Sequence, residues 1–83
     1  MKLTYDPRYN IAYIRLRKKP EQTQTIHISE GLNVDIGPDG AVCGIELLNA
    51  NEQLFSEDNG KLLLVNEEAG ESKEIPLTGV RQK

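Results

Sequence analysis

Apolar and polar positions alternate with a period of two over much of the chain, and this pattern predicts β-strands. Residues 2–5 and 11–17 both alternate, and Asp6-Pro7 between them favours a turn. The two segments are therefore expected to form a hairpin with a loop of about five residues. Residues 22–28 are polar but β-prone, which predicts a third, partly exposed strand.

The clearest hairpin pattern is LNVDIGPDGAVCGIELL, in which residues 37–40 (Gly-Pro-Asp-Gly) form a tight turn. A four-residue loop places Val34 opposite Cys43 and keeps one face apolar throughout. A three-residue loop places Leu32 opposite Glu46 instead. We expect the four-residue loop, because a slip by one residue turns the apolar set outward. Gly44 is a candidate position for a bulge.

The alternation ends after residue 48, where a short helix or turn is expected over residues 51–60, with Asn49 as its N-cap. Residues 61–78 are expected to form a C-terminal hairpin, with a helix over 61–69 as the competing interpretation. The expected fold class is mainly β, bordering on α+β. It is an antiparallel sheet of hairpins or a meander, with one short helix after the fifth strand, in a single domain over residues 1–83.

Composition limits the size of the core. Only 37% of the 83 residues are hydrophobic and 5% are aromatic, and a chain this short buries only about 60–65% of the surface that its unfolded form exposes. Pairing with a second copy would enlarge the core, so a homo-oligomer is expected, with a dimer as the first choice. A protein partner of unknown identity is the other possibility.

Charge is distributed unevenly along the chain. Residues 1–20 carry six basic and one acidic side chain, whereas residues 21–60 carry eight acidic ones and no basic one, and the net charge is −3. An acidic protein is a poor binder of nucleic acid, so nucleic acid is not the expected partner. The basic run Arg15–Lys19 keeps one alternative open, an accessory protein associated with nucleic acid. The sequence contains no stretch typical of a membrane span or a signal peptide, and a cytoplasmic location is expected.

Few residues suit catalysis or metal binding. The single Cys43 and the single His27 have none of the spacings of a zinc site, and no catalytic, cofactor-binding or metal-binding residue is predicted. Asp35 and Glu46 are candidates for a polar pair on neighbouring strands. They are more often solvent-facing strand residues or partners for Arg15 and Arg17. A small enzyme is therefore the least favoured of the alternatives.

The most promising surface lies on the outward face of the second predicted strand. Tyrosine and arginine are enriched at the anchors of protein interfaces. The predicted interface residues are Ile11, Tyr13, Arg15 and Arg17. An equally weighted interpretation is that Tyr13 shields a sheet edge and that the arginines are only solvated. The preferred function is a non-catalytic module that binds a protein or a second copy of itself.

The segments KLTYDPRYNIAYIRL and GLNVDIGPDGAVCGIELLNA resemble those of domain-of-unknown-function family 2283, a small bacterial family. The similarity covers roughly residues 1–50 and follows the order Lys-x-x-Tyr-Asp-Pro, then Tyr-Ile-x-Leu, then Val-Asp-x-x-x-Asp-Gly-x-Val-x-Gly-Ile-Glu. Asn10 departs from the family, in which this position often carries an acid, and the segment after Gly60 extends beyond the common core. The resemblance implies a β fold and a bacterial source, and it implies no reaction.

Overall fold

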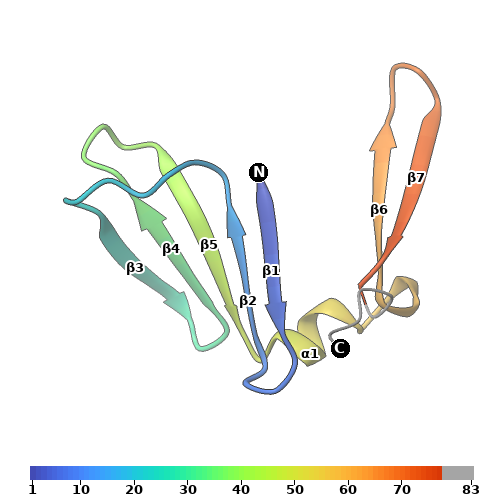
Figure 1. Ribbon diagram of the computed structural model, residues 1–83, viewed down its shortest axis with the longest axis horizontal. Helices are drawn as coiled ribbons and strands as arrows, with labels where there is room; N and C mark the ends of the chain where they lie inside the picture. Colours follow the sequence, from blue (N-terminus) through green and yellow to red (C-terminus); the bar gives the residue numbers. More distant parts are fainter. Residues whose placement is uncertain (78–83) are drawn as a thin grey trace. The chain divides into compact units, whose positions relative to one another are not determined.

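The computed structural model describes residues 1–77, which form two antiparallel sheets (Figure 1). Residues 1–51 form one compact unit and the residues from 52 onward form a second, and each is described by itself. The predicted fold class, mainly β with one short helix after the fifth strand, is confirmed. The last residue of the predicted C-terminal hairpin, residue 78, lies outside the described residues, and the single domain over 1–83 stays a prediction.

The first unit is a five-stranded sheet. Its strands are β1 (Lys2–Asp6), β2 (Ile11–Arg15), β3 (Gln24–Ser29), β4 (Leu32–Ile36) and β5 (Val42–Leu48). Their order in the sheet is β1-β2-β5-β4-β3, with every neighbouring pair antiparallel (Figure 1). The predicted hairpins β1–β2 and β4–β5 are both present in this sheet, and β5 lies beside β2. Both β1 and β3 are therefore edge strands.

The register of the β4–β5 hairpin differs from the prediction. The amide of Gly37 donates to the carbonyl of Ala41, so the loop has three residues rather than four. A bulge then leaves Cys43 as an extra residue between the pairs Ile36–Val42 and Asp35–Gly44. Without the bulge, a three-residue loop would place Leu32 opposite Glu46. The bulge shifts the remaining pairs by one residue, so that Leu32 lies opposite Leu47 and apolar side chains share one face.

The helix after β5 is short. Helix α1 spans Ala50–Leu54, and a 3₁₀ turn follows at Asp58–Gly60. The predicted N-cap Asn49 is not the residue that caps α1. Asn49 has a left-handed φ of 56°, and the first amides of α1 donate instead to Asn10 in the β1–β2 turn. The backbone oxygen of Asn10 accepts from Ala50 at 3.0 Å, and its side-chain oxygen accepts from Asn51.

The second unit contains the hairpin of β6 (Lys61–Asn66) and β7 (Glu71–Pro76). Residues 61–66 thus form a strand, and the alternative of a helix over 61–69 is wrong. Every residue of both strands is exposed, and Leu62 pairs with Ile75. Among the described residues, no helix is long and apolar enough to cross a membrane.

Candidate functional site: the two faces of the five-stranded sheet

One face of the five-stranded sheet is apolar. It carries no Lys, Arg, Asp or Glu, as follows from the cross-strand pairs and the alternation along each strand. Its side chains are those of Leu3, Tyr5, Ala12, Ile14, Leu16, Gln24, Ile26, Ile28, Leu32, Val34, Ile36, Val42, Ile45 and Leu47.

This apolar face is poorly buried. Ala12 is the only one of its side chains that is fully buried, whereas Leu16 is 44% exposed, Ile26 37% and Ile28 56%. Within residues 1–51 the sheet is a single layer, with no second sheet packed on it. A sheet normally buries its apolar face against another layer, so this face has the character of half an interface.

The opposite face is polar and is organised around Tyr13, whose ring lies across the neighbouring strand β5. A Cβ atom on Gly44 of β5 would lie 2.1 Å from the Tyr13 hydroxyl oxygen, which is far too close for two non-bonded heavy atoms. Glycine at this position therefore lets the Tyr13 ring pass over β5 and reach Asp35 on β4. Gly44 is needed for this close approach, and the bulge lies at Cys43 beside it.

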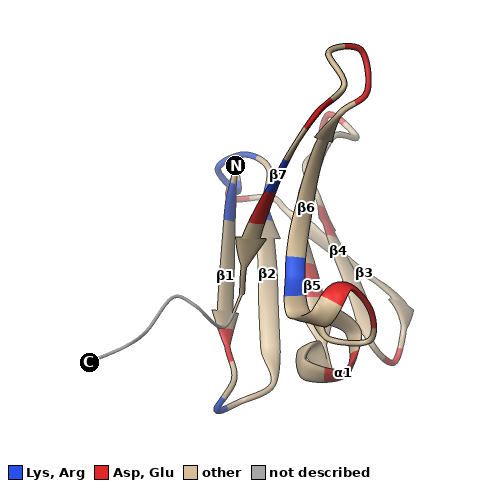
Figure 2. Cartoon of the chain, turned by 90° about the vertical axis from the view of Figure 1, so that its right-hand side faces the viewer, with Lys and Arg blue, Asp and Glu red and all other residues tan. Residues whose placement is uncertain are grey.

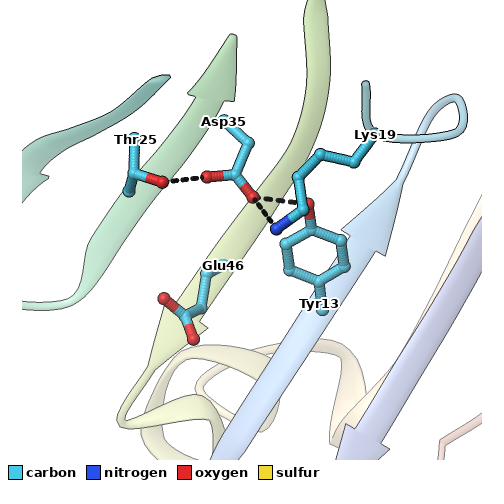
Figure 3. Close-up of a pocket in the computed structure, with 5 residues that line it drawn as sticks. All are labelled: Tyr13, Lys19, Thr25, Asp35 and Glu46. Atoms are coloured by element: carbon cyan, nitrogen blue, oxygen red, sulfur yellow. Dashed lines mark hydrogen bonds and ion pairs between the residues drawn. The ribbon is translucent and has the colours of Figure 1, made fainter. Parts of the chain in front are cut away.

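Asp35 is the centre of the polar network (Figure 3). Its side chain accepts hydrogen bonds from Thr25 Oγ1 at 2.6 Å and from the Tyr13 hydroxyl at 2.7 Å, and the Lys19 ammonium lies 3.4 Å from it. Asp35 is only 6% exposed, which makes it the one buried acidic residue of the described chain. The hydrogen bond from Thr25, followed by those from Tyr13 and Lys19, lowers the pKa of Asp35 against the opposing effect of burial.

Tyr13 is held in its protonated form. Burial and the hydrogen bond that it donates to Asp35 raise the pKa of Tyr13 to about 12. The hydroxyl therefore donates across the neutral range and provides no base. Lys19 also lies over the Tyr13 ring, 6.0 Å from its centroid.

A second row of polar side chains crosses the sheet beside the first. Asn33 on β4 donates from Nδ2 to Glu46 on β5 at 3.0 Å, and its Oδ1 lies 2.9 Å from Nδ1 of His27 on β3. Because the amide nitrogen of Asn33 faces Glu46, its oxygen must accept, and Nδ1 of His27 must carry the hydrogen. His27 is thus oriented by Asn33.

Beside the side chains of this polar face lies a shallow depression of about 400 Å³ that is open to solvent. It is lined by Tyr13, Lys19, Thr25, Asp35 and Glu46 (Figure 3). Tyr13, Thr25 and Lys19 all direct their donors to Asp35, and no buried side-chain nitrogen or oxygen of residues 1–77 lacks a partner. Within the same residues, no group of three or more His, Cys, Asp or Glu side chains is placed to hold a metal ion. The chemistry of the depression is that of a stabilising hydrogen-bond network.

The structure separates the four predicted interface residues. Tyr13 turns inward to Asp35, and Arg17 lies beyond the end of β2 and pairs with Asp39, with its Nη2 at 2.6 Å from the carboxylate. This pair raises the pKa of Arg17 and lowers that of Asp39. Arg15 stays exposed and Ile11 is half-buried. That these residues form an interface remains a prediction.

The predicted polar pair, by contrast, is brought together, since Asp35 and Glu46 line one depression. Their partners are Thr25, Tyr13, Lys19 and Asn33 rather than the arginines. The sequence does not reveal the roles of Thr25 and Lys19. Thr25 meets Asp35 through the pairing of β3 with β4, and Lys19 reaches it from the connection between β2 and β3. In the basic run Arg15–Lys19, both Arg17 and Lys19 form ion pairs with carboxylates. These pairs reduce the positive charge available to a nucleic acid.

Comparison with models of protein families identifies the family of the five-stranded sheet. The family model described as "Protein of unknown function (DUF2283)" matches residues 2–51, which are more than half of the chain and contain the whole five-stranded sheet. No curated protein matches the chain. No solved structure matches it either.

Proposed function

The chain belongs to the DUF2283 family of proteins of unknown function, and from this premise we propose that it is a non-catalytic module that associates with a second copy of itself. The contact is made by the apolar face of the five-stranded sheet. Two sheets packed face to face in this way form a sandwich. The dimer is therefore the unit in which the core of the protein is complete.

The exposure of the apolar face carries this proposal. Leu16, Ile26 and Ile28 are between 37% and 56% exposed, although they lie on the same face as buried Ala12. Complete burial of one such side chain contributes about 1.5–3 kcal/mol, so these three offer roughly 1 kcal/mol each in every copy. An exposed apolar face of this kind promotes aggregation of a monomer, whereas in a dimer its burial contributes binding free energy.

A second copy suits this face for two reasons. The face carries no charged side chain, so two copies can meet there without burying an ion. The chain is also small, and only Ala12, Cys43 and Ala50 are its fully buried hydrophobic residues among those described. A core this small is usually completed by oligomerisation, by disulfides or by a metal. A single cysteine forms no disulfide within the chain.

The experiment is a measurement of the dimer dissociation constant for two lysine variants. Leu16→Lys places a charge on the apolar face, and Thr4→Lys places the same charge on the polar face, where Thr4 is exposed and opposite Tyr13. Both positions are accessible in the isolated chain, so both variants should fold, which circular dichroism verifies. We expect Leu16→Lys to raise the dissociation constant at least about a hundredfold, because both copies lose apolar contact and bury a charge.

Thr4→Lys should leave the dissociation constant within about threefold of the wild-type value, since a solvated surface charge contributes little. Equal dissociation constants for the two variants would contradict the proposal. A wild-type protein that is monomeric at every concentration would contradict it as well.

A further inference from the structure

The two edges of the five-stranded sheet differ in how they are protected. β1 carries Lys2 at its start and Asp6 at its end (Figure 2). β3, with the sequence QTIHIS, contains no Lys, Arg, Asp, Glu or Pro, and all six of its residues are exposed. Edge strands are normally guarded by charges, by proline or by a covering segment, because their free backbone groups readily pair with another chain. β3 lacks these charges and prolines.

No strand of residues 1–77 pairs with the outer side of β3. Its irregularity is a bulge at Ile28, which lies between the pairs His27–Asn33 and Ser29–Leu32. The bulge is near the end of the strand, so residues 24–27 keep a regular register with β4. Residues 24–27 therefore form a regular edge whose outward backbone groups can pair with another strand.

We infer that β3 pairs with β3 of a second copy, antiparallel and about a twofold axis at Ile26, and so joins two five-stranded sheets edge to edge. This contact uses the backbone edge of β3, whereas the contact proposed above uses the apolar face of the sheet. The Ile26 side chain takes part in both, so the edge contact is tested with the face-to-face contact removed. The self-pairing register follows from the alternation along β3. Opposite residues in an antiparallel pair share a face, so Ile26 can meet Gln24, Ile26 or Ile28 of the partner strand. Ile28 lies in the bulge, so the register centred on Ile26 is the regular one in which Ile26 meets an apolar residue.

The register centred on Ile26 satisfies both faces at once. Ile26 then lies opposite its own symmetry mate, and Thr25 lies opposite the partner's His27. The apolar face continues across the junction, and so do the polar rows that hold Thr25 to Asp35 and His27 to Asn33. Because β3 contains no Lys, Arg, Asp or Glu, two copies of this strand can pair without opposing like charges, although each chain has a net charge of −3. A second copy is therefore the occupant that fits this edge.

The test is disulfide trapping in the full-length chain. Cysteine is introduced by Ile26→Cys on β3 or, as the matched control, by Thr4→Cys on the other edge strand, β1. Both variants also carry Leu16→Lys, which removes the face-to-face contact. Cβ atoms opposite each other in an antiparallel pair are close enough for a disulfide after a small adjustment. The native Cys43 is buried and is common to both variants.

We expect Ile26→Cys to form covalent dimers at least about ten times faster than Thr4→Cys under mild oxidation, because pairing raises the local thiol concentration. Equal rates would overturn the inference. This result is distinct from a failure of the proposed function, which would appear as an unchanged dissociation constant in Leu16→Lys. A second variant, Ile26→Lys in the same Leu16→Lys background, should leave only monomer, and dimers that persist in it would also overturn the edge contact.

Discussion

At the scale of single residues, the polar face depends on one glycine. The sequence places Tyr13 in a strand with Ile11 and Arg15, and alternation alone suggests that it points to solvent. Its actual position depends on two non-local pairings, β2 with β5 and β5 with β4, which put Gly44 between Tyr13 and Asp35. The candidate residues Asp35 and Glu46 were predictable from the sequence. The sequence pattern groups Tyr13 with the arginines of its own strand and does not reveal its contact with Asp35.

Replacement of Gly44 tests this close approach. We expect Gly44→Ala to lower the free energy of unfolding by about 1–3 kcal/mol, because its Cβ would collide with the Tyr13 hydroxyl. In a Tyr13→Ala background the collision is absent, so the same substitution should cost less than about 1 kcal/mol. Urea denaturation of the four proteins of this double-mutant cycle gives both values. An identical cost in the two backgrounds would show that the Tyr13 ring does not cross Gly44.

Asp35 gives the polar face a dependence on pH. Because the pKa of Asp35 is lower in the folded chain than its usual value of 3.8, the ionised form stabilises the fold. That contribution is complete above the unfolded pKa and is lost as the pH falls through the folded pKa. We expect the difference in unfolding free energy between wild type and Asp35→Asn to be largest near pH 7 and to shrink below about pH 4.

Asp6 and Asp39 also have lowered pKa values, so the wild-type protein by itself loses stability in acid for several reasons. The comparison with Asp35→Asn isolates the carboxylate of interest, since the other two acids are present in both proteins. Urea denaturation at neutral and acidic pH measures the difference. A difference that stays constant over this range would rule out a stabilising charge on Asp35.

At the scale of elements, the strands were predictable and their connections were less so. Within residues 1–77, seven strands form where alternation or apolar runs indicate them, because period-two patterns are local. The β4–β5 register shows the limit. The sequence predicts Val34 opposite Cys43, but the shorter loop and the bulge at Cys43 each shift the register by one residue in the same direction. Val34 therefore lies opposite Ile45, and the two-residue shift keeps the apolar side chains on one face. Either deviation alone would turn the apolar residues to the wrong face.

The start of α1 shows the same limit. Asn49 fits the local signature of an N-cap, yet the first amides of α1 bond to Asn10, which is distant in sequence. The position at which this chain departs from its family resemblance thus has a structural role: Asn10 provides both its backbone and its side-chain oxygen to the helix. A capping residue supplied from another turn cannot be seen in a local pattern.

At the scale of the whole molecule, the thin core predicted from composition is the observation that connects fold and function. Many apolar side chains are arranged on one face of a single sheet, and few of them are buried. The sequence indicated self-association but directed attention to the Tyr–Arg row on the polar face. The structure shows that the face without charged side chains is the opposite one. That difference arises because the expected core residues of the first hairpin have no second layer within residues 1–51.

The most direct test of the central claim is the dependence of the thermal unfolding midpoint on protein concentration. If a second copy completes the core, mass action should raise the midpoint by about 3–6 °C for each tenfold increase in concentration. Leu16→Lys should weaken this dependence, and Thr4→Lys should retain it. A wild-type midpoint that is the same at every concentration would contradict the claim that the protein folds and acts as an assembly of its own copies.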